Sequence, residues 1–145
     1  MCRENLGVVG LKFSLEISKC GKIDFGGTVM AIHNQHGFEA EALACSYLEN
    51  LGYLLLHKNF SCREGEIDLV MEHNEILVFV EVRSLKRITS VHPLEALSRA
   101  KLSRIVKAAN FYLMKYPTDK NVRFDLVLVL GVASNLKHYQ NILEV

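Results

Sequence analysis

Tryptophan is absent from this sequence and proline and glycine are scarce, with 2 Pro and 9 Gly among 145 residues. No sequence period recurs, so neither a collagen-like chain nor a repeat array fits. The sequence also lacks an excess of charge of either sign, because 17 Lys+Arg are balanced by 16 Asp+Glu. Half of the residues are hydrophobic. Disordered chains combine low hydrophobicity with high net charge. The composition therefore predicts one globular domain with a sizeable core.

Long apolar runs are missing as well. A membrane helix needs about 20 consecutive apolar residues, whereas the apolar stretch near the N-terminus, residues 6–11, ends at Lys12. This stretch is too short for the core of a signal peptide, so we expect neither membrane insertion nor secretion. The four cysteines form no C-x-x-C pair and no zinc-finger spacing. We expect reduced thiols in a cytoplasmic protein, with Cys45 as a small core residue.

Hydrophobic periodicity predicts an α/β fold with the element order α-β-β-β-α-β. The expected helices span 37–51 and 93–116, and the expected strands span 53–60, 66–72, 76–84 and 123–132. Residues 135–145 fit either a last strand or a short helix. The strand at 76–84 is apolar on both faces, so we expect it at the centre of a mixed sheet that helices flank.

Each expected helix carries an apolar stripe. In the first helix the stripe consists of Leu43, Tyr47, Leu48 and Leu51. Gly52 follows as a C-terminal stop. In the second helix, bounded by Pro93 and Pro117, the stripe consists of Leu94, Leu97, Leu102, Ile105, Val106, Ala109, Phe111 and Leu113.

Three carboxylates interrupt these apolar patterns. Asp68 and Glu81 interrupt two apolar strands, and Glu41 lies within the apolar-rich first helix. An unpaired buried carboxylate is costly, so each of them needs a cation, a set of hydrogen-bond donors or a wet cleft. The turn expected at 73–75 brings the two strands side by side. Asp68 and Glu81 are therefore candidates for near cross-strand neighbours.

Two carboxylates on adjacent strands, joined by a third from a helix, form an all-oxygen site that suits Mg²⁺ or Mn²⁺. Asp68 and Glu81 are the expected ligands of one ion, and Glu41 would bind a second ion or orient a ligand water. A shared ion requires the carboxyl groups of Asp68 and Glu81 to lie within about 6 Å of each other. A plainer alternative pairs Glu81 with Arg83, on the same face of its strand, or with another basic residue, and lets Asp68 cap a turn.

Five segments in order carry a family resemblance. They are Gly37…Glu41-x-x-Ala44, Gly65-Glu66-Ile67-Asp68-Leu69, Phe79-Val80-Glu81-Val82, Pro93-x-Glu95-Ala96 and Arg123-Phe124-Asp125. Over about residues 37–130 the chain resembles the YraN family of predicted bacterial endonucleases. That resemblance implies a restriction-endonuclease-like core of the PD-(D/E)xK superfamily. It also implies metal-dependent hydrolysis of phosphodiester bonds in DNA.

One position departs from that signature. The resemblance implies a lysine two residues after the glutamate, which helps to orient or activate the attacking water, and this chain has Arg83 there. Arginine donates hydrogen bonds to phosphate bidentately but does not lose its proton in proteins, so it cannot act as a general base. Three alternatives stay open: water activated by the metal suffices, another group such as Lys101 replaces the lysine, or activity is weak or absent.

A basic stretch runs through the connection between the strand and the second helix. From residue 83 to residue 107, one acidic residue, Glu95, stands against Arg83, Lys86, Arg87, Arg99, Lys101, Arg104 and Lys107. Phosphate contacts dominate nucleic-acid affinity. The residues predicted to bind nucleic acid are Lys86, Arg87, Arg99, Lys101 and Arg104. A solvated helix face gives the same pattern and is the alternative.

Other polar residues receive structural expectations. Glu66 is expected at the surface, and Asp125 is expected to anchor Arg123. The six histidines show no ligand spacing such as i, i+4 on one helix, so none is assigned a role.

The predicted function is that of a metal-dependent DNA endonuclease, in which Asp68, Glu81 and Glu41 hold the metal and Arg83 clamps the phosphate. An alternative is a non-catalytic protein of the same fold that binds branched or single-stranded nucleic acid. A weaker alternative is a structural partner of DNA-processing machinery. By analogy with resolvases of related fold, a homodimer is a further expectation.

Residues 1–29 read differently from the rest of the chain. They lack an apolar stripe, a helix cap and a motif. We predict that they form a non-core extension of a nuclease-like domain at residues 30–145, and Met30 is an alternative start of translation.

Overall fold

A mixed five-stranded sheet organises the part of the chain that the computed structural model describes, which is residues 30–85, 95, 97–131 and 135–143. In spatial order its strands are β1 (Leu54–Cys62), β2 (Gly65–His73), β3 (Ile76–Leu85), β4 (Asn121–Leu130) and β5 (Asn135–Tyr139). β3 and β4 are parallel, and the other neighbours are antiparallel. The predicted fold class and element order are confirmed, and the undecided C-terminal segment contains a strand.

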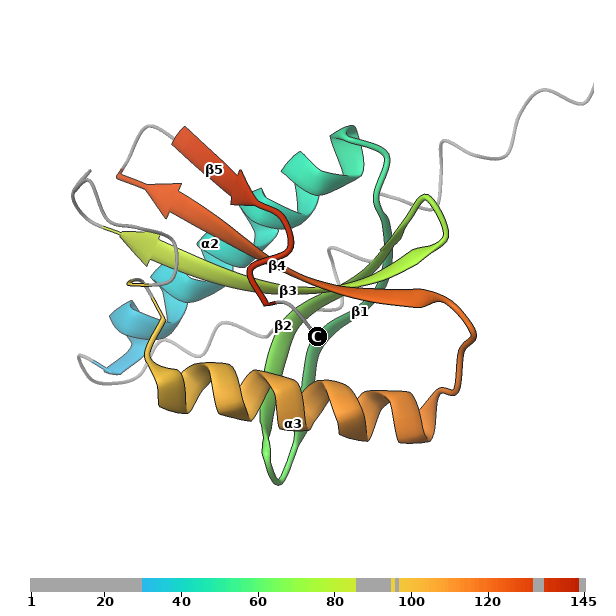
Figure 1. Cartoon of the computed structure of the whole chain (residues 1–145). Coiled ribbons are helices and arrows are strands. Elements are labelled where there is room, and N and C mark those ends of the chain that lie inside the picture. Colours follow the sequence, from blue (N-terminus) through green and yellow to red (C-terminus); the bar gives the residue numbers. More distant parts are fainter. Residues whose placement is uncertain (1–29, 86–94, 96, 132–134, 144–145) are drawn as a thin grey trace, which may run out of the picture.

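One helix covers each face of the sheet (Figure 1). α2 (Met30–Asn50) lies on one face and α3 (Arg99–Lys115) on the other, and each helix packs into its own apolar cluster. α3 provides the crossover that the parallel neighbours β3 and β4 require. Among the described residues, no helix is both long and apolar enough to cross a bilayer.

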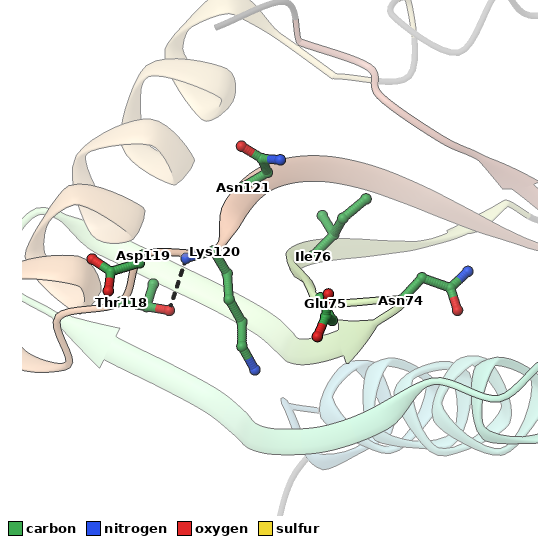
Figure 2. Close-up of a pocket in the computed structure, with 7 residues that line it drawn as sticks. All are labelled: Asn74, Glu75, Ile76, Thr118, Asp119, Lys120 and Asn121. Atoms are coloured by element: carbon green, nitrogen blue, oxygen red, sulfur yellow. Dashed lines mark hydrogen bonds between the residues drawn. The ribbon is translucent and has the colours of Figure 1, made fainter.

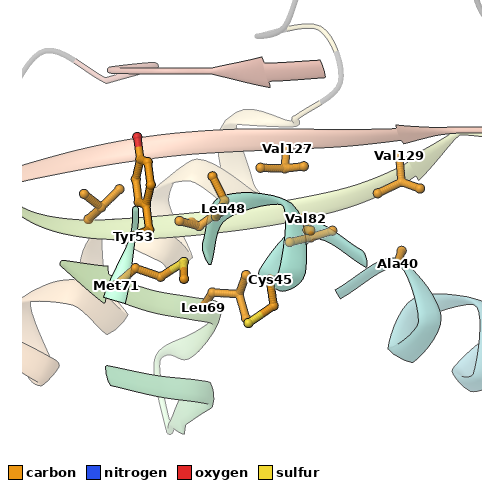
Figure 3. Packing of buried hydrophobic residues seen from close by; sticks show 12 residues of the cluster. Ala40, Cys45, Leu48, Tyr53, Leu69, Met71, Val82, Val127 and Val129 are labelled. Atoms are coloured by element: carbon orange, nitrogen blue, oxygen red, sulfur yellow. The ribbon is translucent and has the colours of Figure 1, made fainter. Parts of the chain in front are cut away.

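α2 packs on the sheet through small side chains. Its buried residues are Ala40, Ala44, Cys45 and Leu48. Figure 3 shows Ala40, Cys45 and Leu48 among the side chains of this cluster. The prediction of a stripe of large residues was partly wrong, because Leu43 and Leu51 are 40% and 48% exposed. The alanines let the helix approach the strands closely. The helix ends where expected, and Gly52 adopts a φ of +88° that favours glycine.

α3 begins later than the sequence pattern indicated, at Arg99 rather than at Pro93. Its N-cap is Ser98, whose side chain accepts a hydrogen bond from the Lys101 N–H at 3.2 Å. Phe111, expected in the buried stripe, is 46% exposed, and Tyr112 is buried in its place. The Tyr112 hydroxyl lies 2.8 Å from His57 Nδ1, which gives this ring the polar partner that buried tyrosines need.

Several expectations fall on residues that the structure does not describe. Residues 1–29, the connection with Lys86 and Arg87, and Pro93 lie outside the described ranges. The non-core extension and the roles of these two cations therefore stay predictions.

Candidate active site

β2 and β3 separate next to Asp68. The paired register of the two strands ends at Leu69 and Val80, the neighbours of Asp68 and Glu81. Beyond this point the Val82 backbone N–H donates to Asp68 Oδ2 at 2.7 Å. A side-chain carboxylate thus takes the place of a backbone carbonyl where the strands diverge, and this bond fixes the orientation of Asp68.

Asp68 and Glu81, called the acidic pair below, lie close enough to shift each other's pKa. Burial raises the pKa of Asp68, although the hydrogen bond from the Val82 N–H and the positive charge of Lys101 oppose this shift. Burial, and then the negative charge of Asp68, raise the pKa of Glu81 to about 7. With its pKa at about 7, the Glu81 carboxyl group binds a proton at mildly acidic pH, where an ordinary glutamate is charged.

Lys101 reaches the acidic pair from α3. Its Nζ lies 3.0 Å from Glu81 Oε1 and 3.9 Å from Glu66 Oε1. Arg83 Nε lies farther away, 3.8 Å from Glu81 Oε1, and the Arg83 side chain is 43% exposed against 19% for Lys101. The lysine is therefore the nearer and the more buried of the two cations. Glu66 lies at the surface, with its side chain 67% exposed.

Glu81 Oε2 is buried and receives no hydrogen bond from the described residues. An unsatisfied buried carboxylate oxygen is costly, and a divalent cation is a suitable partner for it. In the described ranges, no three His, Cys, Asp or Glu side chains are grouped so as to hold an ion. The acidic pair offers two carboxylates, which fits Mg²⁺, because this ion keeps water and substrate oxygens as its other ligands.

Glu41 lies apart from the acidic pair. Burial raises its pKa, the charges of Asp68 and Glu66 add to the increase, and a hydrogen bond with the Asn59 side chain opposes it. Asn59 belongs to β1 and has a φ of +51°, a conformation in which asparagine is enriched. The structure keeps Glu41 within electrostatic reach of Asp68 but does not group it with the pair.

The cations of α3 divide into two kinds. Lys101 turns toward the acidic pair, whereas Arg99 and Arg104 are exposed. Arg104 and Lys101 line a pocket of about 390 Å³ with the β1–β2 turn, and this turn contributes Arg63, a cation that the sequence pattern did not single out. The sequence feature that could have identified Arg63 is its position in the polar turn just before the motif that begins at Gly65.

Gly65 explains how this turn meets α3. A Cβ atom at this position would lie 2.8 Å from the backbone oxygen of Arg104. Only glycine allows the turn to pack so closely on the helix. The absence of a side chain at Gly65 therefore allows the turn and α3 to form this pocket.

A larger hollow of about 750 Å³ lies at the other end of β2 and β3 (Figure 2). It is lined by Asn74, Glu75, Ile76, Thr118, Asp119, Lys120 and Asn121. Figure 2 shows that their polar ends do not converge on one point. Lys120 forms an ion pair with Glu72. This hollow therefore offers no organised set of ligands.

A second buried polar network surrounds Asp125. The predicted anchor is confirmed, because Arg123 Nε and Nη2 donate to its two carboxylate oxygens at 2.9 and 3.0 Å. His138 Nε2 lies 2.9 Å from Oδ2, and the Asn141 N–H donates to Oδ1 at 3.0 Å. Burial alone would raise the pKa of Asp125, but these hydrogen bonds outweigh burial and lower it. This carboxylate is fully satisfied and therefore structural.

Comparison with known proteins places the chain in a family. A sequence profile of the uncharacterised protein family UPF0102 matches residues 40–129, a range that includes Glu41, Asp68, Glu81 and Lys101. The chain belongs to UPF0102. The UPF0102 protein of Fervidobacterium nodosum is 41% identical over 104 residues, which cover 71% of this chain and 77% of the relative. That of Persephonella marina is 41% identical over 106 residues, covering 72% and 90%, and that of Coxiella burnetii is 43% identical over 93 residues, covering 63% and 78%.

Proposed function

We propose that this UPF0102 protein is a metal-dependent nuclease of the YraN type, which hydrolyses phosphodiester bonds in DNA. The observation that carries the proposal is the meeting of three side chains where β2 and β3 diverge: Asp68 accepts a hydrogen bond from the residue after Glu81, and Lys101 Nζ lies 3.0 Å from Glu81. This set of side chains resembles the D…(D/E)-x-K signature of PD-(D/E)xK nucleases, with the lysine supplied by a helix.

Asp68 and Glu81 would hold Mg²⁺ or Mn²⁺, and Glu41 would orient a ligand water or bind a second ion. The chemistry that such an ion supplies is activation of water and neutralisation of charge on the phosphate. Burial raises the pKa of both carboxyl groups of the pair. A nearby cation favours their charged forms, so the pair is better suited to receive a cation than to remain alone.

Lys101 supplies the ammonium group that the signature expects at position 83. From its place beside Glu81, Lys101 can donate a hydrogen bond to a phosphate oxygen or to the attacking water. Arg83, which is more exposed, clamps the phosphate through its guanidinium group. In the reaction the water oxygen bonds to phosphorus, the bond to the leaving oxygen breaks, and that oxygen takes up a proton.

A second function, nucleic-acid binding without catalysis, is favoured by Arg83 at the position of the signature lysine. In that case Lys101 simply neutralises the acidic pair. Both functions would be carried out in the cytoplasm, where Cys45 and Cys62, which are free in the structure, stay reduced.

A cleavage assay separates the two functions. The full-length protein is incubated with linear, nicked, flapped and branched DNAs in the presence of Mg²⁺ or Mn²⁺. We expect cleavage that EDTA prevents and that Glu81→Ala abolishes. Activity unchanged in Glu81→Ala would place the chemistry elsewhere. DNA binding without cleavage, in both the parent and Arg83→Lys, would favour the binding protein.

A further inference from the structure

A stripe of exposed side chains runs along α3 away from the acidic pair. Arg104, Lys107, Phe111 and Met114 follow one another at intervals of three or four residues, which places them on one helix face. All four are exposed, Phe111 by 46% and Met114 by 80%. Lys101, which contacts the acidic pair, lies one turn before Arg104. The stripe therefore begins at the candidate active site.

β1 lies alongside this stripe and runs in the opposite direction. Gly65, just after β1, meets the backbone of Arg104, and farther along α3 the Phe60 ring lies 6.4 Å from the Phe111 ring. The seam between β1 and α3 thus carries cations near the acidic pair and aromatic rings beyond them.

Two acidic residues, Glu64 and Glu66, line the same pocket as Arg63 and Arg104. None of the ion pairs among the described residues involves Arg63, Arg104 or Lys107. Single-stranded nucleic acid is bound by this combination, because its phosphates contact cations while its bases stack on exposed rings. A duplex gains less from the rings, because its bases are already stacked on each other.

We propose that the seam formed by Arg63, Arg104, Lys107, Phe60 and Phe111 holds an unpaired nucleic-acid strand that leaves the acidic pair. The inference rests on the proposed function, because the acidic pair marks the point of cleavage. From Lys101 to Phe111 the helix rises by about 15 Å, at about 1.5 Å per residue. A strand that kept the duplex spacing of about 3.4 Å per nucleotide would place about four nucleotides along the seam, and a more extended strand would place fewer. Substrates with an unpaired arm are therefore preferred over an intact duplex.

The lack of tryptophan in the chain allows a direct test of stacking. Phe111→Trp introduces the only indole, whose fluorescence is quenched when a base stacks on it. The full-length variant is titrated with a 12-nucleotide oligothymidylate in EDTA, and saturable quenching is expected. The control is Phe38→Trp on α2, at a position that is 60% exposed on the other face of the sheet. Equal quenching in both variants, or none in either, would overturn the proposal.

Affinity and its salt dependence provide a second measurement. Stacking on one ring is worth about 1–3 kcal/mol, so Phe111→Ala should weaken oligothymidylate binding by about 5- to 150-fold, and Phe38→Ala should not. Arg63→Ala and Lys107→Ala should each reduce the salt slope by about 0.7, with Lys137→Ala on β5 as the control. Thermal melts verify folding. If Phe111→Ala lowers the affinity for duplex DNA as much as the affinity for oligothymidylate, the proposed role of the seam is contradicted.

Two further outcomes separate this inference from its alternatives. If the parent protein binds oligothymidylate through Phe111 but cleaves none of the DNAs, the seam is supported and the proposed nuclease activity is contradicted. Sedimentation tests a second copy of the chain as the occupant. If Phe111→Ala converts a dimer into a monomer and leaves oligothymidylate affinity unchanged, the seam is a self-association surface and the proposal fails.

Discussion

Lys101 and Arg83 approach the same carboxylate from different elements, and they are expected to contribute unequally to catalysis. Lys101→Met removes the nearer and more buried donor, at 3.0 Å from Glu81, so we expect kcat to fall by about 10²- to 10³-fold. Arg83→Lys introduces the lysine of the D…(D/E)-x-K signature and should retain or raise cleavage. Single-turnover cleavage of a flapped DNA with Mg²⁺ measures both effects.

The control for this comparison is Lys115→Met, which removes a cation from the far end of α3 and should change kcat little. A larger loss in Arg83→Met than in Lys101→Met would show that the signature position, rather than the helix, carries the essential cation.

Glu81 should destabilise the metal-free protein at neutral pH. Because burial and Asp68 raise the pKa of Glu81 to about 7 in the folded state, against about 4.3 when unfolded, the folded protein binds this proton more tightly. Stability then falls as pH rises from about 4 through 7. Glu81→Gln lacks this penalty, so we expect its melting temperature in EDTA to exceed the parent's by several degrees at pH 8 and by little at pH 5. An equal difference at both pH values would contradict this account.

The sequence allowed the acidic pair to be predicted because only one tight turn separates its strands. Asp68 and Glu81 interrupt apolar runs, and a hairpin leaves few registers open. The partnership of Lys101 with Glu81 was only one of several alternatives. Which side of α3 faces the sheet depends on packing against β1 and β2, and local spacing carries no such information.

At the scale of secondary-structure elements, the β1–β2 turn and α3 hold each other in place through Gly65. A methyl group in Gly65→Ala would meet the Arg104 backbone oxygen at 2.8 Å, so turn and helix must separate. We expect a loss of about 1–3 kcal/mol in the free energy of unfolding, and weaker activity because Lys101 moves with α3. Urea unfolding measures the loss.

Gly37→Ala is the matched control. Nothing lies within 4 Å of a Cβ atom at this α2 position, and alanine favours helices over glycine by about 0.5–1 kcal/mol. The control should therefore be neutral or stabilising. A Gly65→Ala variant as stable as the parent would mean that the turn adjusts without cost.

The helices show how far periodicity alone could go. It predicted both helices and part of their buried faces, with Leu48, Ile105 and Ala109 buried as expected. It missed the alanines that α2 turns toward the sheet and the burial of Tyr112 rather than Phe111 in α3. A stripe of large residues misled the prediction in both cases. The buried face depended on how closely α2 could approach the sheet, and on the hydrogen bond between Tyr112 and His57 of β1, 55 residues away.

At the scale of the whole molecule, two buried carboxylate clusters differ in how fully they are satisfied. Both carboxylate oxygens of Asp125 have hydrogen-bond partners, which are Arg123 of β4, His138 of β5 and the Asn141 backbone N–H. Arg123 also donates to the hydroxyl of Tyr53, 70 residues away in the sequence. Glu81 keeps one buried oxygen unpartnered among the described residues. The first cluster stabilises the fold, and the second is the one available for chemistry.

Removal of residues 1–29 tests the predicted domain boundary. If this segment lies outside the core, a chain that starts at Met30 should melt within about one degree of the full-length protein, because unburied terminal segments tolerate deletion. Differential scanning calorimetry measures the change. A loss of several degrees, about what 1 kcal/mol is worth in a domain of about 100 residues, would show that the segment belongs to the fold.

The Val82 amide proton is bonded to a carboxylate at 2.7 Å, whereas neighbouring strand amides are bonded to carbonyls. Hydrogen bonds to charged acceptors are short and strong, so this proton should resonate apart from the other amides of β3 in an NMR spectrum. Any change of charge on Asp68, by a proton or by an ion, alters that bond and shifts the resonance. The chemical shift of the Val82 amide proton therefore reports the charge of the acidic pair, and it can be measured whether or not the protein cleaves DNA.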